Sequence, residues 1–301
     1  MKKIIHKNTT WLQITNPHAE DLTGLRKEFG FHTITVNDLK RPSIRAKVER
    51  YKDYLYMAIH FPIFVPEERM VLPGEIDFLI TKKTLITIHY EKSPALDEFE
   101  EKLLKTPEIK DDYFKNPIRL LYYLLDENFN YSLRQLDHIK LNIDQAQHEI
   151  YKGEELKMVK EISYILRDIL SFKRIVKFND DILRSLEKEV VGLFGDKYQP
   201  YLESLIGKVQ EVNSVVESHL ESINILRDTN QAMLSTKTNE IMKLLGIIAF
   251  LTFPLSIIAN LARNGLNFSD FDSIMGPLIL ISLFVVCSLL VFFYFKGKKW
   301  L

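Results

Sequence analysis

The sequence contains one cysteine, and its charges carry no excess of either sign. Because Cys287 has no second cysteine to pair with, a disulfide within the chain is excluded. The 40 Lys and Arg residues balance the 40 Asp and Glu residues, so the chain has no overall positive field that would attract nucleic acid. No local block of Lys and Arg makes up for this. We therefore expect no nucleic acid among its partners.

The motifs that mark common enzyme chemistries are also missing. None of the 8 His residues has a second His four positions away, and the sequence contains no CxxC pair, no GxSxG elbow, no Walker motif and no dinucleotide-binding motif. The opening residues, MKKIIHKNTTWLQ, are too weakly apolar for a signal peptide. We expect a protein that is not an enzyme and has no cofactor, with its large N-terminal part in the cytoplasm.

Long apolar runs are absent before residue 244, and two of them follow. Residues 244–262 hold no charged residue in 19 positions, and residues 273–295 hold none in 23. Each run is long enough to cross a hydrocarbon core of roughly 30 Å as a helix. The mean hydropathy of -0.07 averages these runs with a charged remainder. The sequence thus predicts two transmembrane helices, with most of the mass on one side of the membrane.

The charges around the two runs predict their orientation. Basic residues lie before the first run and after the second: Lys237, Lys243, Lys296, Lys298 and Lys299. The loop between the runs, residues 263–272, holds one Arg and two Asp. Because the cytoplasmic flanks of membrane helices are enriched in Lys and Arg, we expect both chain termini in the cytoplasm. The protein is then a multi-pass protein of the cytoplasmic (inner) membrane.

The first 115 residues have the pattern of a small α+β domain. Segments rich in β-branched and aromatic side chains predict five strands, at 11–15, 31–36, 54–64, 75–81 and 84–90. Turn signals between them are Asn16-Pro17, Pro66 and Pro73-Gly74. Amphipathic patterns at 20–29 and 96–104 predict two helices that cover the sheet.

From residue 116 onward the pattern is helical. Asn116 can cap a helix and Pro117 suits its first turn, so a helix is predicted from there to about residue 152. Gly153 ends it. A second helix is predicted from about residue 154 to about residue 190, and Gly192 and Gly195 mark the turn after it.

The third helical stretch carries residues spaced alternately by four and three positions, a heptad pattern that predicts helix–helix packing. The seam consists of Tyr198, Leu202, Leu205, Val209, Val212, Val216, His219, Ile223, Leu226, Asn230 and Met233. We interpret His219 and Asn230 as partly solvated; a register-setting role in an oligomer and the lining of a channel are the alternatives. One helix of roughly 90 Å is expected from residue 198 to residue 260. Its partners are the two preceding helices or copies of itself.

Several fragments along the chain are distinctive: residues 238–243 (TNEIMK) before an apolar run with a central Pro, the tail 295–301 (FKGKKWL), and the upstream segments 48–55, 75–80 and 85–89. These fragments resemble the CorA family of divalent-cation transport proteins, and the resemblance covers essentially the whole chain. The resemblance implies a CorA-like homopentameric funnel with a long helical stalk. The first transmembrane helices then line a central pore, and the second ones form an outer ring.

The family carries a Gly-Met-Asn tripeptide just outside the first transmembrane helix, where a ring of Asn oxygens is thought to meet the hydrated ion. The nearest match here is Gly265, Leu266 and Asn267, with Leu in place of Met, an apolar near-isostere. The match lies two residues farther from Pro254 than the family pattern implies. Ion selectivity therefore does not carry over directly, and the family's ZntB-like Zn²⁺ transporters also vary at this tripeptide.

One face of the first apolar run can be read as a pore wall. Positions three and four apart share a helix face, and from Asn239 these positions are Asn239, Met242, Leu245, Ala249, Phe253, Ser256 and Asn260. We name these seven residues the pore stripe. Its cytoplasmic half is apolar and suits gating by dewetting, whereas Ser256 and Asn260 offer neutral oxygens to a hydrated cation, as does Asn267. Helix packing or lipid contact is the alternative interpretation.

Acidic residues are candidates for attracting or sensing cations. Asp270 and Asp272 would place ten carboxylates around a pentameric mouth, opposed by Arg263, and Asp228 could face the stalk lumen as a metal ligand. The clusters 98–101, 111–112 and 180–181 could contribute to cation sites between subunits. For each of these groups, plain solvation is the alternative.

The leading hypothesis is a passive divalent-cation channel gated by intracellular cation, with Mg²⁺ as transported and regulatory ion. The alternatives are a ZntB-like Zn²⁺ transporter and a non-transporting, membrane-anchored oligomeric scaffold. Expected partners are copies of the chain, the lipid bilayer and divalent cations. The expected parts are a cytoplasmic domain (1–115), a stalk (116–243), a pore-lining helix (244–262), an outer loop (263–272), a second transmembrane helix (273–295) and a basic cytoplasmic tail (296–301).

Overall fold

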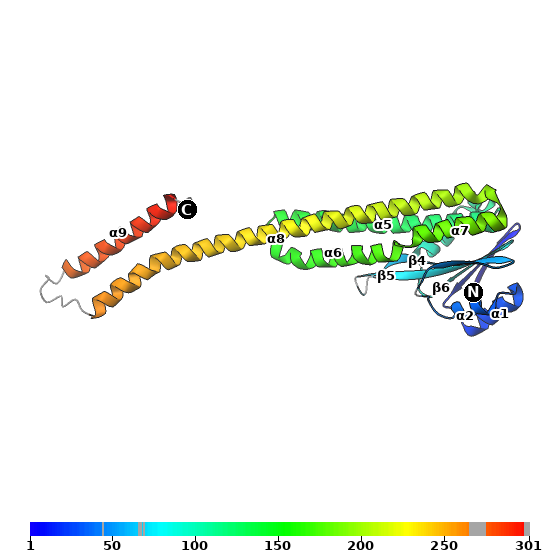
Figure 1. Ribbon diagram of the computed structural model, residues 1–301, viewed down its shortest axis with the longest axis horizontal. Coiled ribbons are helices and arrows are strands. Elements are labelled where there is room, and N and C mark those ends of the chain that lie inside the picture. Colours follow the sequence, from blue (N-terminus) through cyan, green and yellow to red (C-terminus); the bar gives the residue numbers. More distant parts are fainter. Residues whose placement is uncertain (44, 66–67, 69, 265–274, 298–301) are drawn as a thin grey trace. The chain divides into compact units, whose positions relative to one another are not determined.

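The computed structural model describes residues 1–43, 45–65, 68, 70–264 and 275–297. It divides into two compact units, Met1–Arg227 and Asp228–Leu301. The first unit is an α+β domain in which helices cover both faces of one sheet (Figure 1). The second unit contains the C-terminal part of the long helix α8 (Gln199–Asn264) and the helix α9 (Met275–Gly297).

The sheet has six strands in the order β1-β2-β6-β5-β4-β3. The strands are β1 (Lys2–His6), β2 (Thr9–Thr15), β3 (Lys47–Arg50), β4 (Tyr54–Val65), β5 (Met70–Thr81) and β6 (Thr84–His89). All neighbouring strands are antiparallel except β2 and β6, which run parallel. The centre of the sheet is covered on both sides, which is why β4 and β6 read as nearly continuous apolar runs rather than alternating ones.

The helices α1 (Ala19–Phe29) and α2 (Thr33–Asp38) cover one face of the sheet. The other face packs against α3 (Pro94–Lys105), α5 (Pro117–Tyr151), α6 (Glu155–Val176) and α7 (Asn179–Phe194). The short α4 (Lys110–Tyr113) links α3 to α5. Aromatic contacts join strand to helix on this face, with Trp11 against Phe99 and Phe61 against Phe129.

The helix α5 begins where its sequence predicts. The Asn116 side chain accepts a hydrogen bond from the Arg119 backbone N–H (3.0 Å), and Pro117 occupies the first turn, where no hydrogen-bond donor is needed. The helix ends before Gly153, whose φ of 96° lies in the left-handed region that glycine adopts easily.

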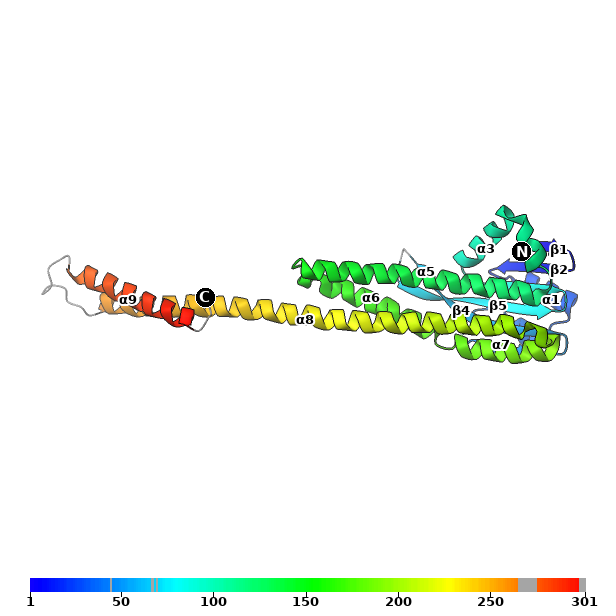
Figure 2. The same ribbon diagram turned by 90° about the horizontal axis from the view of Figure 1, so that it is seen from above.

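The N-terminal part of α8 packs along α5 within the first unit (Figure 2). The heptad seam is buried as predicted, from Leu202 to Leu226. Lys208 pairs with Asp126 of α5 at 2.5 Å, and His219 Nε2 bonds to the Leu136 carbonyl oxygen at 3.0 Å. His219 and Asn230 are 8% and 3% exposed, so our interpretation of them as partly solvated was wrong.

Four other expectations from the sequence were wrong. Gly192, expected in the turn after the second helix, lies inside α7, and the chain leaves this helix at Gly195. Residues 31–36, predicted as a strand, lie largely in α2: the His32 ring accepts the Ile34 N–H, and the Thr35 hydroxyl bonds to Tyr54. Pro73-Gly74 does not turn the chain but lies inside β5. Pro73 pairs with Pro62 of β4, and the Ile63 side chain fills the space beside Gly74.

The predicted helix from 154 to 190 is two helices, α6 and α7, separated at residues 177–178. No Pro or Gly marks this break in the sequence. Asn179, at the start of α7, donates its side-chain amide to the carbonyl oxygen of His60 on β4 (3.1 Å). The break thus depends on a contact between residues 119 positions apart. The strands β1 and β3 were not predicted, because they are short and polar.

Replacing Asn116 by Ala removes the cap of α5. We expect the Asn116→Ala variant to lose about 1 kcal/mol of unfolding free energy, because the Arg119 N–H loses its acceptor. Urea denaturation followed by circular dichroism at constant detergent measures this. Asn116→Asp, which keeps an acceptor, should stay close to the wild type; equal losses in both variants would contradict the capping role.

Candidate ion pathway

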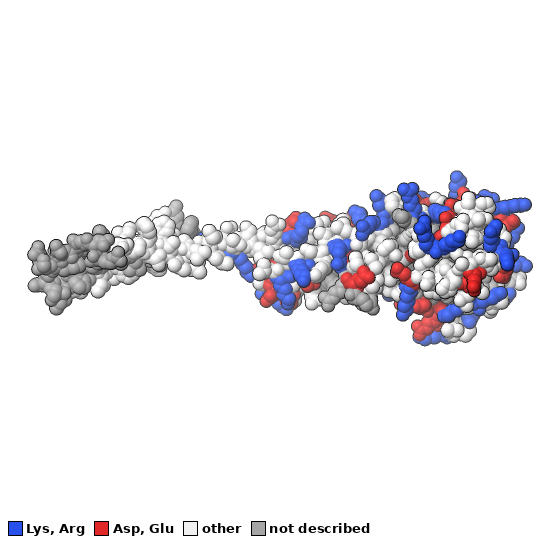
Figure 3. Space-filling model, turned by 90° about the horizontal axis from the view of Figure 1, so that it is seen from below, with Lys and Arg blue, Asp and Glu red and all other residues white. Residues whose placement is uncertain are grey.

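The part of α8 from Leu244 onward is apolar around its circumference and holds no charged residue up to Asn260. Exposed apolar side chains point in every direction from it, including Leu244, Ile248, Phe250, Phe253 and Ile257. Figure 3 shows charged side chains distributed over the first unit, whereas residues 244–260 of α8 include no charged residue. A helix that is hydrophobic all round requires a membrane or protein partners. Among the described residues, α8 is the one helix long and apolar enough to cross a membrane, and α9 contributes a shorter apolar stretch, Phe284–Gly297.

The helix α9 covers one side of this part of α8. Phe250 meets Phe295 of α9 edge to face, with ring centroids 5.7 Å apart, and Phe295 is only 4% exposed. The half-buried residues of α8 lie on the same side as Phe250; they are Gly246, Ile247, Pro254 and Ile258. The packing of α9 therefore gives α8 a covered side and an uncovered side.

The pore stripe lies on the uncovered side. All seven of its residues are exposed, with Met242 at 62% and Phe253 at 68%. At 3.6 residues per turn, the centre of the stripe is rotated by roughly 120° from the side that contacts α9. The structure thus brings the stripe together on one face that is free to meet other chains. Exposure alone does not single it out, because neighbouring apolar residues of α8 are exposed as well.

Polar side chains near the outer end of the stripe bond to the helix backbone. The Ser256 hydroxyl donates to the Phe253 carbonyl oxygen (2.8 Å), and the Asn260 amide nitrogen donates to the Ser256 carbonyl oxygen (2.9 Å). Thr252, which was not among the predicted site residues, donates its hydroxyl to the Ile248 carbonyl oxygen (3.0 Å). Donors held by the backbone leave oxygen atoms as the groups that can contact a cation.

Other predicted site residues cannot be placed on this face. Gly265, Leu266, Asn267, Asp270 and Asp272 lie outside the described residues. Asp228 is exposed near the start of the second unit. Within the part of the chain that the structure describes, no group of three or more His, Cys, Asp and Glu residues is arranged to hold a metal ion.

In the acidic clusters 98–101, 111–112 and 180–181, all carboxylates except that of Asp181 pair with basic side chains of the same chain. Asp111 contacts Lys7 (2.8 Å) and His6 (2.6 Å), and hydrogen bonds from Lys7 and then His6 lower the pKa of this carboxyl. The remaining pairs are Asp112 with Arg119, Asp180 with Arg184, Glu98 with Arg134, Glu100 with Lys2 and Glu101 with Lys105. A cation site at these clusters would have to displace a Lys, Arg or His.

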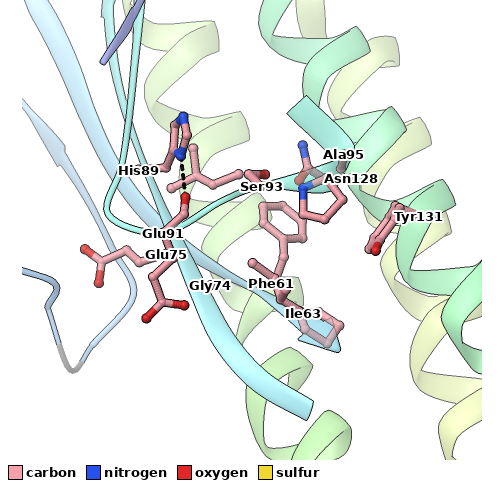
Figure 4. A pocket seen from close by; sticks show the side chains of 13 residues that line it. Phe61, Ile63, Gly74, Glu75, His89, Glu91, Ser93, Ala95, Asn128 and Tyr131 are labelled. Carbon is pink, nitrogen blue, oxygen red and sulfur yellow. Dashed lines mark hydrogen bonds between the residues drawn. The ribbon is translucent and has the colours of Figure 1, made fainter. Parts of the chain in front are cut away.

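A small cavity of about 10 Å³ lies between the sheet and α5, lined by Phe61, Ser93 and Asn128 (Figure 4). At its edge, His89 Nδ1 donates to the Glu91 carbonyl oxygen (2.6 Å), and burial lowers the pKa of His89, which keeps the ring neutral. The cavity has room for about one water molecule. It is therefore a packing feature rather than a ligand site.

Comparison with known proteins identifies the family. The CorA-like Mg²⁺ transporter protein family matches residues 6–298. The chain belongs to this family. The cobalt/magnesium transport protein CorA of Thermotoga maritima is 25% identical over 300 residues, covering 97% of this chain and 83% of the relative.

Solved structures show the same fold. The CorA magnesium transporter of Methanocaldococcus jannaschii superposes with a TM-score of 0.81 at 17% identity, covering 100% of this chain and 95% of that one. The cytoplasmic domain of ZntB from Vibrio parahaemolyticus matches with a TM-score of 0.55 at 16% identity, covering 77% and 90% of the two chains. The CorA fold, an α+β domain followed by a long helix, is thus the fold of this chain.

Proposed function

We propose that this protein is a passive divalent-cation channel of the cytoplasmic membrane, with Mg²⁺ as its ion. In this proposal five copies surround a pore lined by α8, and α9 is the second transmembrane helix. Membership of the CorA-like Mg²⁺ transporter family supports the activity. The observation that carries the arrangement is the uncovered side of α8, because α9 occupies one side and the pore stripe lies away from it.

The apolar half of the pore stripe is the proposed gate. Around a five-fold axis, Met242, Leu245 and Phe253 would form successive rings of apolar side chains. A narrow apolar ring excludes water, and a hydrated ion cannot cross it without losing part of its hydration. A small rotation of α8 that moved Phe253 off the axis would admit water, so the gate needs no large movement.

The polar half of the stripe is the proposed filter. Mg²⁺ releases its water ligands slowly, so a filter that accepts the hydrated ion avoids that cost. The amide nitrogen of Asn260 is bonded to the Ser256 carbonyl, so its amide oxygen is the group presented to water ligands of the ion. Asn267 would form a second ring farther out, and Asp270 and Asp272 would concentrate cations at the mouth.

The orientation and regulation follow from the same arrangement. With α8 and α9 both crossing the membrane, the two chain termini lie in the cytoplasm and the connecting loop outside, as the basic flanking residues favour.

Intracellular cation would close the channel by binding where subunits meet. Asp228, exposed near the start of the second unit, is the proposed ligand for such an ion.

A second candidate is a Zn²⁺ transporter. The displaced tripeptide at 265–267 favours it, and the likeness to the ZntB cytoplasmic domain is compatible with it. Competition separates the two: Mg²⁺ should suppress Zn²⁺ flux in a magnesium channel but not in a zinc transporter. A non-transporting scaffold is the third candidate, and it predicts no flux of either ion.

The deciding experiment is ion uptake by proteoliposomes that contain the full chain. We expect Mg²⁺ to enter down its gradient, faster than into protein-free vesicles, as measured with an entrapped fluorescent indicator. Mg²⁺ inside the vesicles should slow the flux. If Mg²⁺, Co²⁺, Ni²⁺ and Zn²⁺ all enter no faster than into protein-free vesicles, the channel proposal is wrong.

The Asn260→Ala variant loses the ring of amide oxygens that is proposed to bind the hydrated ion. We expect this loss to weaken ion binding by about 1.4 kcal/mol, which corresponds to a factor of ten, and to lower Mg²⁺ flux roughly tenfold. Ser282→Ala is the matched control, since Ser282 is a small polar residue of α9 whose hydroxyl also bonds to its own helix (2.8 Å). The control should transport normally. Equal flux in both variants and the wild type would remove Asn260 from the filter.

Phe253→Ser should raise the basal flux at high internal Mg²⁺, because a hydroxyl in the narrow ring favours wetting of the gate. The matched control is Phe293→Ser, a change at an exposed residue of α9. Flux assays on vesicles preloaded with Mg²⁺ make the comparison. A leak in the control alone would place the gate elsewhere.

A further inference from the structure

Two acidic residues lie inside the sheet of the first unit. Glu75 and Asp77 are two positions apart on β5, so both side chains lie on the same face of the sheet, the one covered by α1 and α2. Figure 4 shows the Glu75 carboxylate directed away from Phe61 and Asn128, which belong to the opposite face. Asp77 is 0% exposed and Glu75 is 7% exposed. Acidic side chains are rarely buried so completely unless they are paired.

Asp77 receives hydrogen bonds from neutral donors. The Tyr56 hydroxyl donates to Oδ1 (3.0 Å) and the Tyr90 hydroxyl to Oδ2 (2.7 Å). Among the described residues, no Lys, Arg or His forms an ion pair with Asp77. The nearby Lys47 lies over the Tyr56 ring, but its ammonium group pairs with Asp38 (2.6 Å) and Glu49 (2.9 Å).

Glu75 is satisfied on one oxygen and not on the other. Its Oε2 accepts the Ser43 backbone N–H (2.6 Å) and forms an ion pair with His60 Nε2 (3.2 Å). Its Oε1 is buried and has no hydrogen-bond partner in the described structure. An unpaired buried oxygen costs free energy, so a donor is expected beside it. A protonated Asp77 is such a donor, because it lies two positions along β5 on the same face, and a hydrogen bond with Glu75 is among the causes that raise its pKa.

The electrostatics agree with a proton on Asp77. Burial, and then the negative charge of Glu75, raise the pKa of Asp77 to about 7, although the hydrogen bonds from Tyr90 and Tyr56 lower it. Burial lowers the pKa of His60, but the hydrogen bond and charge of Glu75 outweigh burial, and the net shift is upward. His60 is thus the basic group paired with Glu75, and among the described residues Asp77 has no basic partner.

Four of the elements around the pair contribute polar groups, whereas α1 contributes the apolar side chains Leu22 and Leu25 to this face. Charged or titratable residues come from α2, β3, β4 and the end of β6: Asp38, Lys47, Glu49, Tyr56, His60 and Tyr90. The Lys47 charge is already shared by two carboxylates. The basic groups around the pair can therefore balance one negative charge on it, but they do not balance a second one.

We propose that Glu75 and Asp77 form a proton-binding site in which the two carboxyl groups share one proton at neutral pH. With the proton present, Asp77 donates to Oε1 of Glu75, and every oxygen of the pair has a partner. Loss of the proton leaves two adjacent carboxylates beneath α2 and the segment that carries Ser43. Their repulsion loosens this cover, so the domain responds to cytoplasmic pH. The site does not depend on which ion the protein transports.

Infrared difference spectroscopy on the full chain in detergent tests this directly. The C=O band of a protonated carboxylic acid is separate from the carboxylate bands, so its loss reports deprotonation. We expect one such band to titrate near pH 7 in the wild type and to be missing in Asp77→Asn. A wild-type spectrum without the band at pH 5, or a band unchanged in Asp77→Asn, would overturn the proposal.

Two further variants must shift the midpoint in opposite directions. Glu75→Gln removes the neighbouring charge and should lower the midpoint by roughly one pH unit, whereas Tyr90→Phe removes a donor to the carboxylate and should raise it. A group with a merely structural role would not respond with opposite signs. Shifts of the same sign would contradict the shared proton. A wild-type midpoint that moves with Na⁺ or K⁺ concentration would show a bound cation instead.

The pH dependence of stability gives an independent readout. An unfolded Asp ionises near pH 4, while folded Asp77 holds its proton to about pH 7. Between these values folded Asp77 holds a proton that unfolded Asp77 has lost, so its contribution to the unfolding free energy should fall as pH rises from about 4 to about 7. Asp77→Asn should lack this fall in its urea midpoint, and Asp53→Asn, at an exposed site, should keep it. Parallel profiles for wild type and Asp77→Asn would refute the site.

Discussion

The hydrophobic surface of α8 is the constraint on which the remaining architecture depends. In the first unit this surface is a heptad seam from Leu202 to Leu226, buried against helices of the same chain. In the second unit apolar side chains surround the helix, and among the described residues α9 covers one side of it through Phe250 and Phe295. Apolar surface left in water is costly, so the uncovered side, with the pore stripe, requires lipid or other copies. The fold of one chain therefore leaves an apolar surface that a partner, either lipid or protein, has to cover.

The sheet of the first unit also buries apolar side chains, with two acidic residues as the exception. Both faces are covered, so its central strands carry apolar residues almost without a break, and Glu75 and Asp77 interrupt that pattern on β5. The Tyr hydroxyls, His60 and the Ser43 backbone compensate for part of the burial cost of these two carboxyl groups. The shared proton supplies the remaining hydrogen bond, from Asp77 to Oε1 of Glu75. Domains that bury acids in this way are sensitive to pH because burial disfavours the charged form.

Local patterns predicted the elements whose signals lie within a few residues. The cap at Asn116, the strands at 54–64 and 84–90 and the heptad seam were predicted because period, capping and burial are encoded locally. The strand predicted at 31–36 was wrong: its β-branched residues pack onto the sheet through Thr35 and Tyr54 instead of joining it. The break before Asn179 was invisible for a similar reason, since it depends on a bond to His60. The pore stripe remains a prediction, and the predicted loop residues from Gly265 to Asp272 lie beyond those described.

The sequence by itself determined the α+β class, the apolar C-terminal helices and, through scattered fragments, the family. The first two follow from composition and periodicity, which the chain carries whatever its neighbours are, whereas the family rests on the resemblance of those fragments. Only the tertiary structure decided which side of α8 is covered by α9, that His219 is buried against Leu136, and that Glu75 and Asp77 lie among neutral donors with one oxygen unpaired. Burial and pairing depend on residues distant in sequence, because the free energy of a charge is set by the groups that folding brings around it.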